Sequence, residues 1–255
     1  MIAFRMGLLA LAALAIIVAL VVFRPKEACA TEYDLSAYLA DPDDLARIIG
    51  CADAAFADRL VAASLASEMR LDQRFRPAET WKDAVRAFVD GRPRGNDAAE
   101  GFAIRLAVDA VGEPADPPFI GAPFTELESA AIAVRVAGAA ELATYLARID
   151  EGNIAADMTG LPPPLRGKLE PSNYPLRVSV FTPDDARRFA TLLDAWEGIP
   201  DDAIDRLAAH EAEYWDPDGG MEMAVSLLYD KDTLVGWLEA AAESGKTLFL
   251  FYESF

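Results

Sequence analysis

An unbroken apolar run lies near the N-terminus of this chain and limits the structures that the segment can form. Residues Met6–Phe23 are 18 consecutive uncharged residues, MGLLALAALAIIVALVVF. A helix of that length spans about 27 Å, close to the hydrocarbon thickness of a bilayer. We predict that residues 4–23 form a single-pass transmembrane or signal helix. The chain then divides into a membrane anchor or signal segment, residues 1–31, and a single acidic domain, residues 32–255.

Two fates of the N-terminal segment stay open. Arg24-Pro25-Lys26-Glu27 puts charge and a helix breaker directly after the run, and the run is longer than the apolar part of most secretory signals, so an uncleaved anchor is favoured. Ala28-Cys29-Ala30 nevertheless has the small-x-small form of a cleavage site, and cleavage after Ala30 would yield a secreted or periplasmic protein. The flanking charges are nearly balanced and do not decide orientation. We expect the domain on the outer face of the cytoplasmic membrane.

The domain that follows is strongly acidic. The whole chain has a net charge of −19, and residues 31–255 carry 20 basic and 41 acidic side chains, a net charge of −21. Binding to nucleic acid or to an anionic lipid surface needs clustered Lys and Arg, so we predict no nucleic-acid partner. The charge favours a cationic protein as partner, and acidity that only keeps the domain soluble is the alternative.

Alternation and helix-start signals predict an α+β fold, a mostly helical domain around a small sheet. Tyr33–Leu39 alternates with period two, which predicts a strand. Asp41-Pro42-Asp43-Asp44 then begins a helix that Gly50 closes. Thr247–Tyr252 is apolar on both faces, which predicts a central, buried strand. Further elements are predicted as helices at 54–71, 78–89, 97–111, 126–148 with a break near Gly138, 186–196, after 200–202 and 232–243, and as a strand at 177–181.

Two stretches lack periodicity. Residues 112–123 are rich in proline, which predicts a connection. Residues 150–175 contain Pro162-Pro163-Pro164 and predict a cover over the domain, or else a boundary between two halves.

No motif predicts a metal or a cofactor. His210 is the single histidine, which excludes a His-cluster metal site. Gly245-Lys246-Thr247 precedes a predicted strand, whereas a phosphate-binding loop follows one. A calcium loop that began at Asp216 would lack a carboxylate at its twelfth position. Cys29 and Cys51 could form one bridge in an exported chain, but a buried or idle thiol is favoured.

The segment around the histidine is the candidate partner-binding site. His210, Tyr214, Trp215 and Asp216 place aromatic rings beside acids, a composition suited to contact with a cationic surface. Core packing of Tyr214 and Trp215 is the alternative, as is a surface or helix-end position for His210. No catalytic residue is predicted, because among 41 acids some pair always suggests acid and base catalysis.

Three segments carry a resemblance to a known family: Tyr33–Gly50 (YDLSAYLADPDDLARIIG), Thr80–Gly91 (TWKDAVRAFVDG) and Gly236–Tyr252 (GWLEAAAESGKTLFLFY). In order and spacing they resemble an uncharacterised bacterial domain-of-unknown-function family related to the YfbM-type domains. The resemblance covers most of residues 32–253 and implies an α+β fold, with no activity, cofactor or catalytic residue to carry over. Members usually begin near the first strand, so residues 1–31 depart from the pattern.

These features together predict a membrane-tethered or exported, non-enzymatic binding domain. Its role would be capture of a cationic protein, as immunity proteins do. A carboxylate-dependent hydrolase with its site near residues 150–175 is the alternative, and a structural domain without a partner is a third interpretation.

Overall fold

A computed structural model describes residues 33–66, 78–91, 98–121, 127–151, 162–166, 176–214 and 219–254. Residues 1–31, with the predicted membrane segment, lie outside this part of the chain. No helix within the described ranges is long and apolar enough to cross a membrane. The prediction for residues 4–23 therefore stays a prediction.

Helices and a single sheet make up the described domain. The strands are β1 (Tyr33–Ala40), β2 (Glu113–Gly121), β3 (Leu176–Phe181) and β4 (Thr247–Ser254). The helices are α2 (Pro42–Ile48), α3 (Ala54–Ala66), α4 (Ala78–Asp90), α5 (Ala98–Val111), α6 (Leu127–Val136), α7 (Ala140–Glu151), α8 (Pro183–Asp194), α9 (Asp201–Tyr214) and α10 (Gly219–Ser244), with a short 3-10 helix, η1 (Pro163–Leu165). This mixture confirms the α+β composition predicted from the sequence.

The four strands form an antiparallel sheet in the order β2-β1-β4-β3. β1 and β4 pair along their whole length, from Tyr33 opposite Ser254 to Ala40 opposite Thr247. The strands from the two ends of the domain are thus neighbours at the centre of the sheet, and almost every other element lies between them in the sequence. The prediction of a small sheet that contains strands from both ends of the domain's sequence is confirmed.

β4 is the buried central strand that its sequence predicts. Leu248 and Leu250 pack into the core on one face of the sheet, and Phe249 and Phe251 pack into the core on the other. All four side chains are fully buried. A strand that is apolar at every position needs a core on both sides, and β4 has one.

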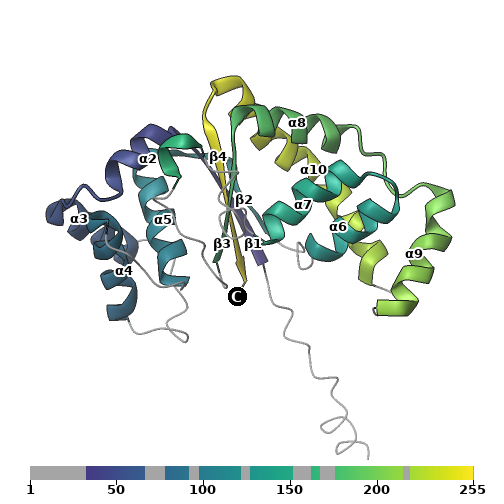
Figure 1. Ribbon diagram of the computed structural model, residues 1–255, viewed down its shortest axis with the longest axis horizontal. Coiled ribbons are helices and arrows are strands. Elements are labelled where there is room, and N and C mark those ends of the chain that lie inside the picture. Colours follow the sequence, from purple (N-terminus) through teal and green to yellow (C-terminus); the bar gives the residue numbers. More distant parts are fainter. Residues whose placement is uncertain are drawn as a thin grey trace, which may run out of the picture. The chain divides into compact units, whose positions relative to one another are not determined.

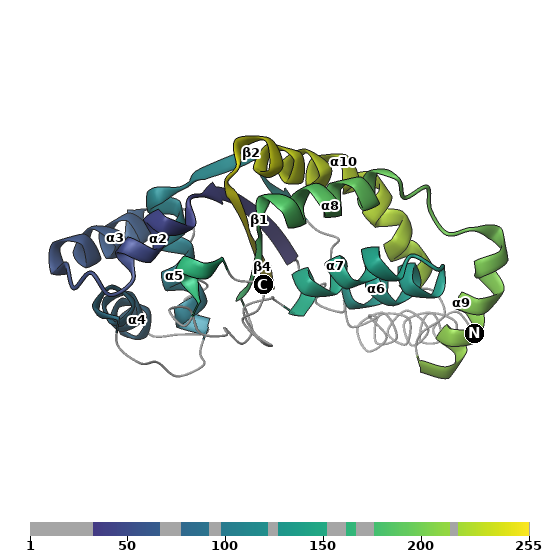
Figure 2. The same ribbon diagram turned by 45° about the horizontal axis from the view of Figure 1, so that its top comes forward.

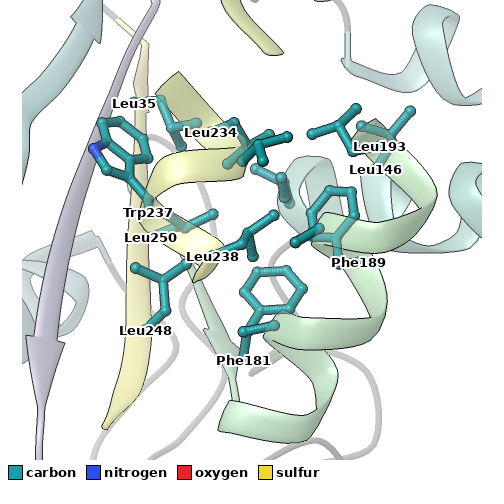
Figure 3. Close-up of a cluster of buried hydrophobic side chains, with 14 of the residues drawn as sticks. Leu35, Leu146, Phe181, Phe189, Leu193, Leu234, Trp237, Leu238, Leu248 and Leu250 are labelled. Carbon is teal, nitrogen blue, oxygen red and sulfur yellow. The ribbon is translucent and has the colours of Figure 1, made fainter. Parts of the chain in front are cut away.

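Helices cover both faces of the sheet (Figure 1). α2, α3, α4 and α5 supply one core, to which η1 adds Leu165. α6, α7, α8 and α10 supply the other core. In this second core, Trp237 and Leu238 of α10 lie against Leu248 and Leu250 of β4 (Figure 3). The sheet is therefore the middle of three layers.

The helix starts follow from local side-chain chemistry. The Asp41 side chain accepts a hydrogen bond from the Asp43 N–H at 2.8 Å, and Pro42 is the first residue of α2. Thr182 Oγ1 accepts one from the Asp185 N–H at 3.2 Å at the start of α8. Both caps satisfy backbone donors that have no partner inside the helix. The two predicted helix starts are confirmed.

The ends of α2 and α4 meet backbone to backbone. The Gly50 N–H donates to the Phe88 carbonyl at 3.2 Å, and the Ala52 N–H donates to the Val89 carbonyl at 2.8 Å. Gly50 and Gly91 both have positive φ, +79° and +64°. A Cβ at Gly91 would lie 2.8 Å from the Gly50 Cα, closer than nonbonded carbon atoms approach. The contact therefore depends on glycine at position 91.

Two predictions about element boundaries are wrong. Residues 112–123, predicted as a connection, contain β2, whose prolines are tolerated because β2 is an edge strand and needs no N–H on its outer side. α10 begins at Gly219 and not at Asp232. Lys231 lies within this helix, where its Nζ donates to the carbonyls of Asp194 and Trp196 after α8.

Candidate functional site

Two of the four predicted partner-binding residues lie in a described helix, and the other two lie in the segment after it. His210 and Tyr214 belong to the second half of α9. Trp215 and Asp216 lie outside the described residues. The predicted cluster of these four residues therefore stays a prediction. The nearest surface with described side chains is the first half of α9, residues 201–207.

One side of this half-helix carries exposed acids beside an exposed apolar side chain. Asp201, Ile204 and Asp205 are exposed and are neighbours at helical spacing. We call these three residues the α9 outer face. Ile204 is 39% exposed, unusually open for a large aliphatic side chain in the described part of this domain. The Asp202 carboxylate is paired with Arg206, 3.3 Å away, which leaves Asp201 and Asp205 to set the charge of this face.

The inner side of the same half-helix is held by few contacts. Ala203 and Leu207 are its buried residues. Leu207 packs with Ala133 of α6 in a small cluster that is separate from the two main cores, with Val136 and Ile199 at its edge. α9 lies at the end of its layer farthest from the sheet in both views (Figure 1 and Figure 2). It is therefore an outlying helix with one small apolar attachment among its described side chains.

A second polar group joins α7 to β3 and α8. The Arg148 guanidinium lies 4.9 Å from the Phe181 ring centre and 5.4 Å from that of Tyr145. Its Nη1 is 3.5 Å from an Asp185 carboxylate oxygen. In return, the buried Ser179 hydroxyl donates to the Arg148 carbonyl at 2.7 Å. We call these five residues the Arg148 cluster.

The polar groups of the Arg148 cluster are bonded to one another and to the neighbouring Thr182. Its carboxylate, Asp185, accepts from the Thr182 hydroxyl at 3.0 Å as well as facing the guanidinium. Burial, followed by the charge of Asp185, raises the pKa of Tyr145 above its usual range. A tyrosine with a raised pKa stays neutral and is a poor base at neutral pH. The Arg148 cluster therefore fits a structural role, in which it holds α7, β3 and α8 together, better than a role in acid and base catalysis.

A surface ion pair lies next to this cluster. Arg188 Nε and Nη2 donate to the two carboxylate oxygens of Glu141 at 2.7 and 2.5 Å. This hydrogen-bonded guanidinium lowers the pKa of Glu141, and the carboxylate raises the pKa of Arg188. The pair links α7 to α8 on the exposed side of the domain.

Among the described residues, Ser36 Oγ and Trp196 Nε1 are buried and have no hydrogen-bond partner. Ser36 lies opposite Phe251 in the sheet, whose ring is in the α2 to α5 layer. Trp196 lies in the core of the other layer. Because the sheet separates them, they do not form one site.

The described ranges contain no group of three His, Cys, Asp or Glu residues that could hold a metal ion. The hydrolase site predicted near residues 150–175 stays a prediction, since most of that segment lies outside those ranges. Cys51 is exposed, so of the expected buried or idle thiol only the idle thiol stays open for this residue. Its bridge to Cys29 is a prediction that reaches outside the described chain.

Comparison with known proteins identifies a family. A domain of unknown function, DUF7691, matches residues 32–253. The chain belongs to the DUF7691 family. The DUF7691 match runs from just before β1 to the last residues of β4, so it includes both cores and α9. No curated protein and no solved structure matches this chain.

Sequence reasoning missed Ile204 and the Arg148 cluster, since exposure and contacts between distant segments leave no local signal.

Proposed function

We propose that this DUF7691 domain is a non-enzymatic binding domain that captures a cationic protein, in the manner of an immunity protein. The observation that carries the proposal is the α9 outer face, where the exposed Ile204 lies one helical turn from Asp201, and Asp205 is exposed beside them. Protein recognition often combines an apolar side chain that the partner buries with nearby charges opposite in sign to those of the partner. A basic surface with a small apolar pocket would be its complement.

The charge of the whole domain supports the same partner class. Residues 31–255 have a net charge of −21, and the resulting field attracts cationic proteins and speeds their association. His210 and Tyr214 belong to the second half of α9, beyond the residues of the outer face. With Trp215 and Asp216 they complete the surface that we propose for the partner.

The proposal also covers the location of the protein and its relation to another domain family. The apolar run at residues 4–23 would hold the domain on the outer face of the cytoplasmic membrane, or cleavage near Ala30 would release it as a secreted or periplasmic protein. We also propose that the bacterial YfbM-type domains are related to this family, on the order and spacing of the three segments that resemble them.

The test is capture of basic proteins by the immobilised full-length chain at low ionic strength, followed by binding of each purified candidate across a salt series. A basic partner whose affinity falls as salt rises is the expected result. The variant Asp201→Asn with Asp205→Asn should weaken that binding severalfold. The matched control, Asp83→Asn with Asp109→Asn, removes two exposed acids from the opposite layer and should weaken it much less.

The two parts of the proposal can fail separately. If no basic protein binds with a salt-dependent affinity, the capture of a cationic protein is refuted. If one binds and both double variants weaken it equally, the partner exists but does not use the α9 outer face.

A further inference from the structure

We infer that α9 is a hinged helix, which opens away from α6 as one unit while the rest of the domain stays folded. The opening is a property of the chain without any partner. It therefore goes beyond the proposed capture, and its test needs no binding partner.

The first support is the small attachment of α9. Its described inner side buries Ala203 and Leu207, and Leu207 packs in the small cluster with Ala133 and not in a main core. The remaining described side chains of α9 are exposed. Segments with few buried apolar contacts open at a lower free energy than the whole domain. Opening of α9 would disturb this cluster and the contact that Ile199 makes at the edge of the main core, and would leave the buried side chains of that core in place.

The neighbouring helix α8 provides the contrast. α8 buries Ala186, Phe189, Ala190 and Leu193, all in the main core of its layer. Phe189 is packed among the other core side chains around Phe181 (Figure 3). Separation of α8 would open that core, so α8 can leave only when the domain unfolds.

The second support is the position of the hinge. Lys231 of α10 donates to the carbonyls of Asp194 and Trp196, at 3.2 and 3.0 Å, and holds the chain in place up to the end of α8. Beyond this anchor, residues 197–200 have no regular structure, and Gly198 has a φ of +115°. A glycine there allows large backbone rotations at little cost. Rotation at Gly198 would move α9 without moving α8.

On the other side of α9, the next described element begins with two glycines. α10 begins with Gly219-Gly220, and glycine lowers the stability of a helical turn. Those residues can adjust when α9 moves, while Lys231, further along α10, keeps its bonds to the end of α8.

Opening would uncover apolar surface next to an acidic face. Leu207 and Ala133 are buried when α9 is closed, and both would reach solvent when it opens. A ligand that binds the open state better than the closed state would increase the open population. The hinge thus gives this end of the domain two states that a partner could select.

Hydrogen exchange of the full-length chain, without partner and under native conditions, tests the hinge. The amides of Asp205–Ala209 are compared with those of α8 and β4, because the first residues of a helix have N–H groups without intrahelical acceptors. We expect α9 amides to be protected at least about tenfold less than those of α8. The variant Leu207→Ala should lower α9 protection by a further tenfold or so and leave α8 and β4 unchanged.

Leu192→Ala is the matched control, since Leu192 is a half-buried leucine of α8 packed against the main core. This variant should lower the protection of α8 and β4. Equal protection of α9, α8 and β4 in the unmodified chain would overturn the inference. A uniform loss of protection across all three in Leu207→Ala would overturn it as well, because α9 would then open only with the whole domain.

Discussion

Replacement of Gly91 by alanine tests the backbone contact between the ends of α2 and α4. The Cβ of Gly91→Ala would lie 2.8 Å from the Gly50 Cα and 3.6 Å from its N. Both neighbours are backbone atoms, so no flexible side chain can move aside. The substitution must shift one helix end and disturb the hydrogen bond from the Gly50 N–H to the Phe88 carbonyl.

The expected loss of stability has two parts. A left-handed φ costs an alanine about 1 to 2 kcal/mol relative to glycine. Forced movement of packed backbone adds about 1 to 3 kcal/mol, as overpacking of a core does. Gly91→Ala should therefore lower the free energy of unfolding by roughly 2 to 5 kcal/mol, a large share of the 5 to 15 kcal/mol typical of a domain.

Gly245→Ala separates the two parts. Gly245 has a φ of +69°, close to the +64° of Gly91, but a Cβ there meets nothing within 4 Å. The Gly245→Ala variant should lose only the conformational part of the unfolding free energy, about 1 to 2 kcal/mol. Gly50→Ala should resemble it, since its Cβ would lie at an ordinary 3.5 Å from the Gly91 Cα.

Urea unfolding of the full-length variants, followed by far-ultraviolet circular dichroism, measures these differences. Gly91→Ala should have a clearly lower midpoint than Gly245→Ala, with an unchanged slope. If the two variants lose the same stability, the steric contact between the helix ends contributes nothing and the reasoning is refuted.

Three further substitutions test other contacts. Thr182→Ala removes the cap of α8 and should cost about 1 kcal/mol in urea unfolding; no loss would contradict the cap. Trp237→Phe removes the 2.7 Å bond from its indole N–H to the Pro117 carbonyl and should cost about 0.5 to 1.5 kcal/mol by the same assay. Arg188→Met should raise the pKa of Glu141 towards its usual value, seen by NMR titration; because the folded pKa is lowered, the stabilisation by this pair is present at neutral pH and is lost as pH falls through that pKa.

Local chemistry explains the elements that sequence reasoning predicted correctly. The start of α2 at Pro42 depends on Asp41 beside it, and the start of α8 depends on Thr182 in the same way. The break between α6 and α7 comes at Gly138, whose φ is +98°. In each case the interacting groups lie within a few residues of one another.

β2 shows where local reasoning fails. Pro114, Pro117 and Pro118 lower the strand propensity of residues 113–121, and sequence patterns alone predict a loop there. The segment becomes a strand because β1 offers an unpaired edge and because Trp237 of α10 binds the Pro117 carbonyl. Both partners are far away in the sequence.

Of the candidate binding residues, some could be chosen from the sequence and one could not. His210, Tyr214, Trp215 and Asp216 could be chosen from composition, because they are consecutive or one helical turn apart. Ile204 could not, because an isoleucine in a helix is usually buried, and only the packing of α9 on α6 decides that this one is exposed.

Composition and neighbouring residues are enough to recognise the apolar N-terminal run, the acidity of the domain, the capped helix starts and the buried strand near residue 250. Long-range packing is needed to explain the pairing of β1 with β4, the edge strand β2, the approach of Gly50 to Gly91 and the Arg148 cluster. These features join segments that are distant along the chain. Their formation depends on loop closure and on the burial of shared surface, which no local pattern encodes.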